Sequence, residues 1–335
     1  MKRRTVLKGA PSKDSLLSRA LSRRRSPRVE KPEQVEPIFE MGPVEAPVME
    51  MLSKARIVGR MARQTEYLHV SDLLGKCMRK FALFESLKIS PKPQSVSLTD
   101  ALTYAQGDAI HDVLRARLVQ GAPDKVWGKW RCSCGHHTIQ EPCTYVSIDK
   151  SILCGRCSTP AHVYVEATMR DEEFKIVGNP DIVLYLAQHD ALYVTELKSI
   201  SHDQWRELVR PHPDHVLQVV FYWFLMHRKG YRLADKVSVV YATKGWMFSG
   251  SPCKEFVLNP LREVERLKRY TDYAVQLQEF RKGGALPIRV CSNPRDTLAK
   301  NCEVCTTCFE GNSHARPVEI SVAQALAGGS GRRRA

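Results

Sequence analysis

Hydrophobic positions along the middle of the chain follow two spacings, one typical of helices and one typical of strands. Helical spacing predicts helices at 47–64, at a segment that Ser71 would cap and that runs to Phe84, at 97–120, at 213–229, and from Pro260 to about Lys282. Runs rich in Val, Ile and Tyr predict strands at His162–Met169, Phe174–Leu186, Ala191–Ile200, Val237–Thr243 and near Phe256. This order predicts an α/β fold with a small mixed sheet flanked by helices. In the helix at 97–120, the expected apolar stripe consists of Ala101, Tyr104, Ile110, Leu114 and Leu118.

The two ends of the chain differ in composition from its middle. Residues 1–45 are rich in Arg, Ser, Pro and Glu, which predicts a disordered basic tail, and 316–335 predict a flexible one. The net charge is +15, but residues 1–30 carry +8 and the final arginines carry +3, which leaves about +4 for the middle. The positive charge is therefore no sign that the folded part binds nucleic acid.

The chain shows no run of 18 apolar residues and no apolar stretch behind its basic start. A spanning helix and a secretory signal are therefore not expected, and neither is a membrane partner. We expect a cytoplasmic protein, with a mitochondrial one as the alternative because the start is rich in Arg and Ser.

Nine of the eleven cysteines form two clusters, whereas Cys77 and Cys253 stand apart, and this clustering favours metal ligands over disulfides. In the first cluster, two close pairs predict a four-thiolate zinc site formed by Cys132, Cys134, Cys154 and Cys157. Cys143, His136 or His137 could replace one of these ligands, because the first pair has one intervening residue instead of two. The surrounding module at 127–160 contains many Cys, Gly and Pro residues and is expected to be rich in loops.

Candidate catalytic residues lie in two of the predicted strands. Asp181 follows Asn179-Pro180, and Glu196-Leu197-Lys198 comes fifteen residues later. Adjacent strands would bring Asp181 and Glu196 together, and paired carboxylates favour Mg²⁺ or Mn²⁺. Lys198 shares a strand face with Glu196 and could position or deprotonate a water for attack on a phosphodiester. A turn aspartate and a solvated strand face are the simpler alternative.

Two helices contribute further candidates. His111 lies one turn after Gly107, which would let that helix approach the sheet closely, and the imidazole could bind a metal. Gln218 and Tyr222 are spaced i,i+4 and so share a helix face. Glu166 lies in the strand before Asp181.

The ordered set formed by Gly107, His111, Asp181, Glu196, Lys198, Gln218 and Tyr222 resembles the PD-(D/E)XK nucleases. The resemblance spans about 70–309 and is closest to the RecB-like branch, which includes CRISPR-associated iron–sulfur exonucleases and bacteriophage-encoded relatives. It implies a restriction-endonuclease-like core in which His111, Asp181, Glu196 and the backbone of Leu197 bind Mg²⁺ or Mn²⁺. Lys198 would act on the water, and Gln218 and Tyr222 would support Lys198 and the substrate.

The resemblance also implies a function. It predicts a metal-dependent deoxyribonuclease, an exonuclease on single-stranded DNA or DNA ends, that acts in recombination, repair or DNA degradation. The expected partners are DNA and a helicase, a recombinase or a single-strand-binding protein, and the expected setting is the cytoplasm of a bacterium or of a phage-infected cell. A non-catalytic DNA-binding or recombination factor that retains the fold is the alternative.

An iron–sulfur clasp is the last implication of the resemblance. A [4Fe-4S] cluster would be held by Cys77, Cys291, Cys302 and Cys308, with Cys305 as the competing ligand. A zinc site formed by Cys291, Cys302, Cys305 and Cys308 is the rival.

The chain is then expected to divide into six parts. They are the tail at 1–45, a helical part with the first cluster cysteine at 46–126, the zinc-ribbon-like module at 127–160, the nuclease core at 161–285, the iron–sulfur segment at 286–315 and the tail at 316–335.

Overall fold

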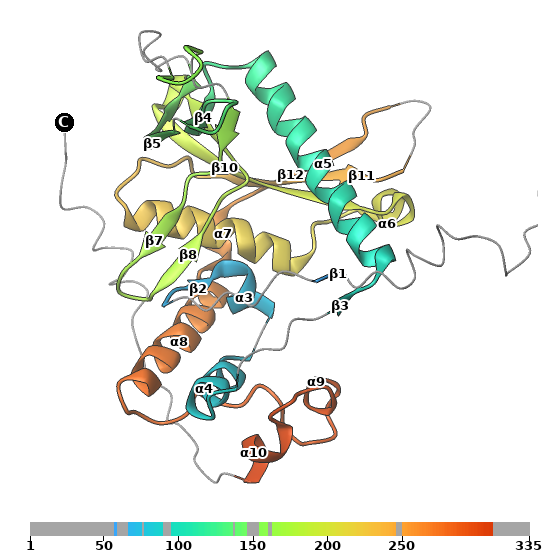
Figure 1. The fold of residues 1–335 in the computed structure, drawn as a ribbon, viewed down its shortest axis with the longest axis vertical. Helices are drawn as coiled ribbons and strands as arrows, with labels where there is room; N and C mark the ends of the chain where they lie inside the picture. Colours follow the sequence, from blue (N-terminus) through green and yellow to red (C-terminus); the bar gives the residue numbers. More distant parts are fainter. Residues whose placement is uncertain are drawn as a thin grey trace, which may run out of the picture. The chain divides into compact units, whose positions relative to one another are not determined.

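A computed structural model describes residues 57–58, 66–75, 77–89, 95–136, 138–145, 154–159, 163–245 and 250–310. All of these belong to one compact unit, Arg56–Ala335. The unit combines a mixed sheet with helices that flank it, as the sequence predicts (Figure 1). The tails expected at 1–45 and 316–335 lie outside the described residues.

The largest sheet has seven strands and holds both of the candidate strands. Its order is β12 (Cys253–Leu258), β11 (Val237–Thr243), β10 (Ala191–Ile200), β9 (Ile182–Leu186), β4 (Val126–Arg131) and β5 (Thr138–Thr144), and β6 (Val163–Val165) also pairs with β4. β10 is parallel to β11, whereas the other pairs are antiparallel. The sheet is therefore mixed, and β10 runs through its middle.

Two smaller sheets lie outside this one. A three-stranded sheet has the order β2 (Leu68–His69), β8 (Ile176–Gly178) and β7 (Met169–Asp171), and a two-stranded sheet pairs β1 (Ile57–Val58) with β3 (Ser95–Val96). β8 and β9 belong to different sheets, although only three residues separate them. Asp181 is the last of these three, so it lies at the junction of two sheets.

Two helices, α5 (Leu98–Gly121) and α7 (Pro213–Arg228), cover opposite faces of β10. Gly107 of α5 faces Ser199, whereas Gln218 of α7 contacts Lys198. Neighbouring residues of a strand point to opposite faces, so the two helices must lie on opposite sides. A side-chain cap by Ser97 starts α5, and Pro213 occupies the first turn of α7, where its missing N–H is not needed.

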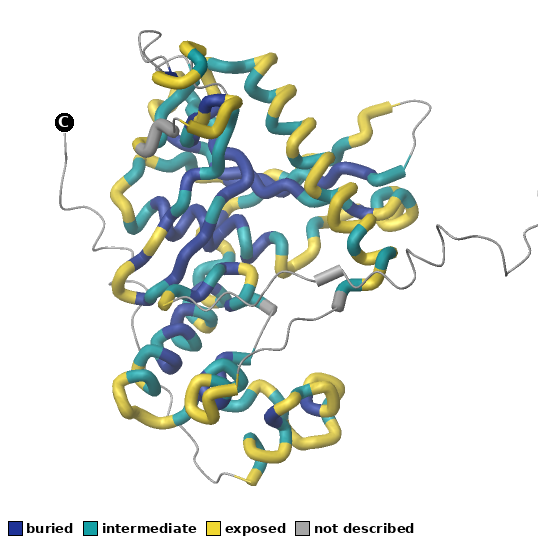
Figure 2. Tube along the Cα trace, viewed as in Figure 1, coloured by how far each residue is buried: buried dark blue, intermediate teal, exposed yellow. Residues whose placement is uncertain are grey.

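The two helices differ in burial (Figure 2). α7 is apolar nearly all round and buries ten consecutive or nearly consecutive residues between Val216 and Met226 in the main core. α5 has no fully buried residue, and Tyr104 of its expected apolar stripe is 63% exposed. The stripe prediction is wrong at this position, because α5 meets the sheet through the small residue Gly107 and through polar side chains.

The remaining helices are α3 (Val70–Gly75), α4 (Met78–Ser86), η2 (Ala187–His189), α6 (His202–Glu207), η3 (Pro260–Glu263), α8 (Val264–Arg281), α9 (Thr297–Lys300) and α10 (Cys305–Glu310). Of these helices, α3, α4 and η3 pack against α8, whereas α6 packs against β11. α8 also packs against α7, and α10 packs against α4. The end of the described chain thus returns to one of its first helices.

Many predicted elements are confirmed, and others need correction. The strands expected at His162–Met169 and Phe174–Leu186 each divide in two, β6 and β7 in the first case and β8 and β9 in the second, and the two members of each pair belong to different sheets. The helix that Ser71 was expected to cap is two helices, α3 and α4, because the chain is extended at Cys77. α3 begins at Val70, so Ser71 lies inside it and is not its cap. The module at 127–160 contains strands β4 and β5 in addition to loops. Within the helix expected at 47–64, the β-branched pair Ile57 and Val58 forms a strand instead, and the rest of that range is not described.

The described ranges contain helices of up to 24 residues, the longest being α5. None of them is long and apolar enough to cross a membrane.

Candidate functional site

Four cysteines of the inserted module meet at one point. The sulfur atoms of Cys132, Cys134, Cys154 and Cys157 all lie within 4.8 Å of one another. Two cross-pair distances are 3.1 Å, between Cys132 and Cys157, and 3.4 Å, between Cys134 and Cys154. A group of four sulfurs at this spacing could hold a metal ion, as the sequence predicts.

The two cysteine pairs lie in tight turns, and each turn is closed by a residue with positive φ directly after the pair. Gly135 follows the first pair with a φ of +75°, a conformation that glycine adopts without strain, and its N–H bonds the carbonyl of Cys132 at 2.8 Å. Ser158 follows the second pair with a φ of +53°, and its N–H bonds the carbonyl of Cys154 at 2.7 Å. Each turn folds the backbone around its two sulfurs and aims both toward the other pair.

Thr159 joins the group through its hydroxyl, which lies 3.3 Å from the sulfur of Cys132 and 2.9 Å from that of Cys157. This hydroxyl, followed by Cys157, lowers the pKa of Cys132 to about 5. The N–H of His136 lowers the pKa of Cys134, but the neighbouring thiols Cys132 and Cys154 outweigh it and raise that pKa to about 12. Four sulfurs this close can all ionise only when a cation shares their charge.

The alternative ligands lie apart from this group. Cys143 is in β5, and its carbonyl accepts a hydrogen bond of 3.0 Å from the indole of Trp130. His136 is exposed and donates its backbone N–H near Cys134. Neither belongs to the four-sulfur group, and His137 lies outside the described residues.

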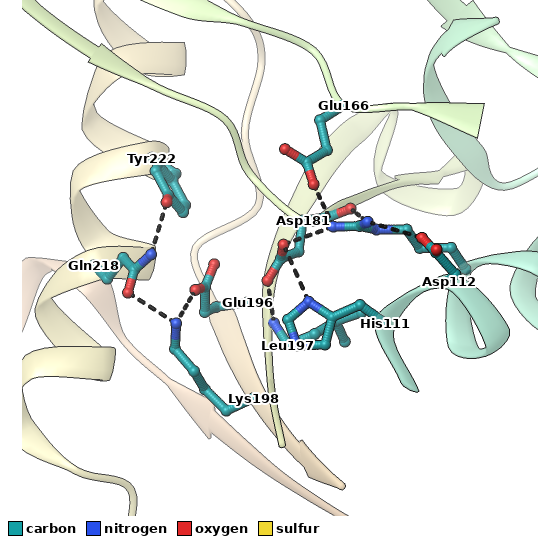
Figure 3. A network of polar contacts seen from close by, with 10 residues as sticks. His111, Asp112, Glu166, Asp181, Glu196, Leu197, Lys198, Gln218 and Tyr222 are labelled. Carbon is teal, nitrogen blue, oxygen red and sulfur yellow. Dashed lines mark hydrogen bonds and ion pairs between the residues drawn. The ribbon is translucent and has the colours of Figure 1, made fainter. Parts of the chain in front are cut away.

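A second site lies on β10, on the face that α7 covers. The ammonium of Lys198 donates to Glu196 Oε1 at 2.5 Å and to Gln218 Oε1 at 3.0 Å. Gln218 in turn donates from Nε2 to the hydroxyl of Tyr222 at 2.8 Å (Figure 3). The i,i+4 pair of α7 and the two alternate residues of β10 thus form one hydrogen-bonded chain.

The ring of Tyr222 fits against Gly178, at the end of β8. A Cβ at position 178 would lie 2.7 Å and 2.8 Å from two ring carbons of Tyr222, closer than side chains approach. Burial also raises the pKa of Tyr222 well above its usual value, so its hydroxyl stays neutral. Glycine at position 178 therefore allows the tyrosine to reach Gln218.

Asp181 connects α5 with β10. Its Oδ2 accepts the backbone N–H of Leu197 at 2.8 Å, and its Oδ1 lies 3.7 Å from Nδ1 of His111 (Figure 3). Gly107 permits this approach, because a Cβ there would lie 3.1 Å from the hydroxyl of Ser199. His111 and Asp181 come from elements that are 70 residues apart in sequence and yet lie side by side.

Arg115 is a site residue that sequence reasoning missed. Its Nη2 donates to Asp181 Oδ1 at 2.8 Å and also to Glu166, and its Nε lies 3.3 Å from the backbone oxygen of Asp181. Arg115 follows His111 by four residues, so the helical spacing that placed His111 near the sheet also places Arg115 there. The i,i+4 spacing from His111 is thus the sequence feature that could have indicated Arg115 as a site residue.

The site holds more negative charge than its surroundings favour. Glu196 is only 2% exposed, and its Oε2 is buried without a hydrogen-bond partner in the structure. Burial and then the charge of Asp181 raise the pKa of Glu196 well above its usual value. Burial likewise raises the pKa of Glu166 to about 7 and lowers the pKa of His111. Lys198 pairs with Oε1 of Glu196, so Oε2 is the atom of this buried carboxyl that has no partner among the described residues.

The remaining predicted ligands lie where the C-terminal segment meets α4. Burial and the nearby thiols of Cys77, Cys302 and Cys308 raise the pKa of Cys291. Lys80 forms an ion pair with Glu303, so α4 and this segment are joined beside the thiols. Among the described residues, however, these sulfurs do not form a group as close as that of the inserted module.

Comparisons with known proteins do not identify a family. No family model and no curated protein matches the chain. A solved structure described as "Crystal structure of SSO0001" is similar, with 18% identity over 70% of this chain and 87% of that chain, and a TM-score of 0.33. A similarity of this size supports no conclusion about the fold or the activity.

Proposed function

We propose that the chain is a metal-dependent deoxyribonuclease that cleaves phosphodiester bonds of single-stranded DNA or DNA ends. The observation that carries this proposal is the hydrogen-bonded chain from Tyr222 through Gln218 and Lys198 to Glu196, beside Asp181. Buried carboxylates next to a positioned ammonium suit the activation of a water at a phosphate.

The residues fit a hard divalent cation such as Mg²⁺ or Mn²⁺. Asp181, Glu196 and His111 would hold it, since carboxylate oxygens are its preferred ligands and the imidazole is neutral at pH 7. The buried, unpartnered Oε2 of Glu196 is the oxygen that such a cation would satisfy. A bound cation of this kind stabilises charge on a phosphoryl oxygen and makes water a better nucleophile.

The side chains around the cation then have separate tasks. Lys198 is held from two sides by Glu196 and Gln218, so its ammonium has a fixed position for orienting the water. The hydroxyl of Tyr222 fixes the amide of Gln218 so that its oxygen, not its nitrogen, faces Lys198. The N–H of Leu197 fixes the position of the Asp181 carboxylate through Oδ2.

The proposal also includes the protein family and the metal of the four-cysteine group. We assign the chain to the RecB-like branch of the PD-(D/E)XK nucleases, and we assign zinc to the four cysteines of the inserted module. Thiolates alone, in two pairs, are typical of structural zinc sites. DNA is the expected partner, together with a helicase, recombinase or single-strand-binding protein.

The nuclease proposal is tested with purified protein, Mn²⁺ or Mg²⁺ and end-labelled single-stranded DNA. Asp181→Ala and Lys198→Ala should each lower cleavage by about a hundredfold or more, because each removes a member of the catalytic set. Lys175→Ala is the matched control: it belongs to the similar triplet Glu173-Phe174-Lys175, whose lysine pairs with Glu66 and Glu172 away from the site. Cleavage that survives in both site variants would refute the assignment.

A [4Fe-4S] cluster on Cys77, Cys291, Cys302 and Cys308 completes the proposal. The mutual effect of these thiols on the pKa of Cys291 supports it, as does the packing of α10 against α4. Protein purified without oxygen should be brown, and Cys77→Ser should remove its visible absorbance. Cys305→Ser should keep the colour. If Cys305→Ser removed the visible absorbance and Cys291→Ser did not, Cys305 would be the cluster ligand in place of Cys291.

The second candidate is a non-catalytic DNA-binding factor that keeps the fold. The contact between Arg115 and Asp181 favours it, because a guanidinium already neutralises the proposed metal ligand. The two candidates therefore differ in whether a divalent cation can reach Asp181.

A further inference from the structure

The proposed function gives no role to Arg115, although this arginine contacts Asp181 directly. Three of its contacts are to the acidic side of the site: Nη2 to Asp181 Oδ1 at 2.8 Å, Nη2 to Glu166, and Nε to the backbone oxygen of Asp181 at 3.3 Å. The side chain is only 16% exposed. A largely buried guanidinium is costly unless carboxylates surround it, and here Asp181 and Glu166 contact it while Asp112 lies 3.7 Å away on the same helix.

The two carboxylates and the arginine balance one another. Burial by itself lowers the pKa of Arg115, but Glu166 and then Asp181 outweigh it and raise that pKa above its usual value. Without the guanidinium, Asp181 and Glu166 would be like charges close enough to act on each other. Arg115 thus keeps the acidic site stable as long as no other cation does so.

Arg115 also occupies the oxygen that a metal would need. Oδ2 of Asp181 already accepts the N–H of Leu197, whereas Oδ1 is the oxygen that faces both Arg115 and Nδ1 of His111. A cation shared by His111 and Asp181 must therefore bind on the Oδ1 side. A guanidinium and a divalent cation at the same oxygen repel each other, so they compete.

We propose that Arg115 is a displaceable counterion, which neutralises Asp181 in the metal-free protein and gives up Oδ1 when the divalent cation binds. This inference rests on the proposed function, because the cation at Asp181 is part of it. Glu166 and the backbone oxygen of Asp181 keep the guanidinium beside the site after the exchange. There its planar group of donors suits a phosphate of the DNA strand.

The test measures Mn²⁺ binding in the absence of DNA, with the signal of free Mn²⁺ in electron paramagnetic resonance. Asp181→Asn defines the binding at other sites, which is subtracted. Arg115→Gln should bind Mn²⁺ at the carboxylate site roughly tenfold more tightly than the wild type, because a competing positive charge next to a carboxylate is removed. Arg117→Gln is the matched control on the same helix: Arg117 is exposed and bonds Gln120, so its variant should bind like the wild type.

Thermal unfolding separates a counterion from a residue that only packs. Arg115→Gln should unfold at a lower temperature than the wild type without Mn²⁺, and Mn²⁺ should remove most of that difference. A packing residue would lower the temperature equally with and without the ion. Arg115→Lys keeps the charge but changes the packing, so it should bind Mn²⁺ nearly as the wild type does.

The outcomes distinguish this inference from the proposed function. Equal Mn²⁺ affinity in the wild type and in Arg115→Gln would overturn the counterion role and leave the nuclease proposal standing. A wild type and an Arg115→Gln variant that both fail to bind Mn²⁺ at the carboxylate site would overturn the proposed function and this inference together.

Discussion

The four-cysteine group and the carboxylate site gather their polar side chains in opposite ways. The four sulfurs come from two short turns within 26 residues of the chain, and each sulfur lies 3.4 Å or less from at least one of the others. The carboxylate site takes its members from α5, the β8–β9 junction, β10 and α7. One site is built by local turns, and the other by the packing of the whole sheet with its two helices.

This difference has a consequence for what each site tolerates. The cysteine turns depend on a few backbone hydrogen bonds and on residues with positive φ. The carboxylate site depends on close approach between elements that are far apart in sequence, at Gly107 and at Gly178. A substitution in the cysteine module should therefore alter the structure only locally. In contrast, adding a single methyl group at Gly107 or Gly178 should displace the catalytic residues.

The largest expected effect is on metal content. Cys154→Ser removes one of four ligands, so bound zinc should fall from about one ion per chain to nearly none, since structural zinc binds through all four. The sheet should stay folded around it, because the buried Trp130 packs with Tyr145 and Tyr164 and not with the four grouped cysteines. Elemental analysis measures the metal, and the DNA assay should show that most cleavage is retained.

Cys143→Ser is the control for this prediction, because Cys143 lies in the same module but outside the group. It should keep its zinc. If Cys154→Ser instead lost cleavage together with zinc, the two regions would be coupled. The path would be β6, which pairs with β4 next to Cys132 and leads directly to Glu166.

The same contrast explains how much the sequence could predict. The spacing of the cysteines contains nearly all the information about their site, and the structure confirms the group Cys132, Cys134, Cys154 and Cys157. Helix and strand periodicity likewise gave β10, β11, α5 and α7 nearly to the residue. β10, β11 and α7 have strong apolar patterns, and α5 is long, with a capping serine at its start.

Short elements and partners across the fold were harder to predict. β4 and β5 were expected to be loops, because the glycines and cysteines in this module obscure the strand pattern. The split between α3 and α4 depends on the extended backbone at Cys77, which no local propensity dictates. Arg115 was missed because its importance comes from Glu166, which lies 51 residues away.

The smallest expected effect concerns a single methyl group. In Gly178→Ala, the new Cβ would meet the ring of Tyr222 at 2.7 Å, so the ring or β8 must shift. Overpacking of this kind costs about 1–3 kcal/mol of the free energy of unfolding, which chemical denaturation measures. Because the hydroxyl of Tyr222 holds Gln218, and Gln218 holds Lys198, the turnover of DNA should fall while Mn²⁺ affinity changes little.

Gly121→Ala is the matched control, since a Cβ there meets nothing within 4 Å at the end of α5. A variant at position 178 that is destabilised but cleaves DNA like the wild type would show that Tyr222 is not needed to position Lys198.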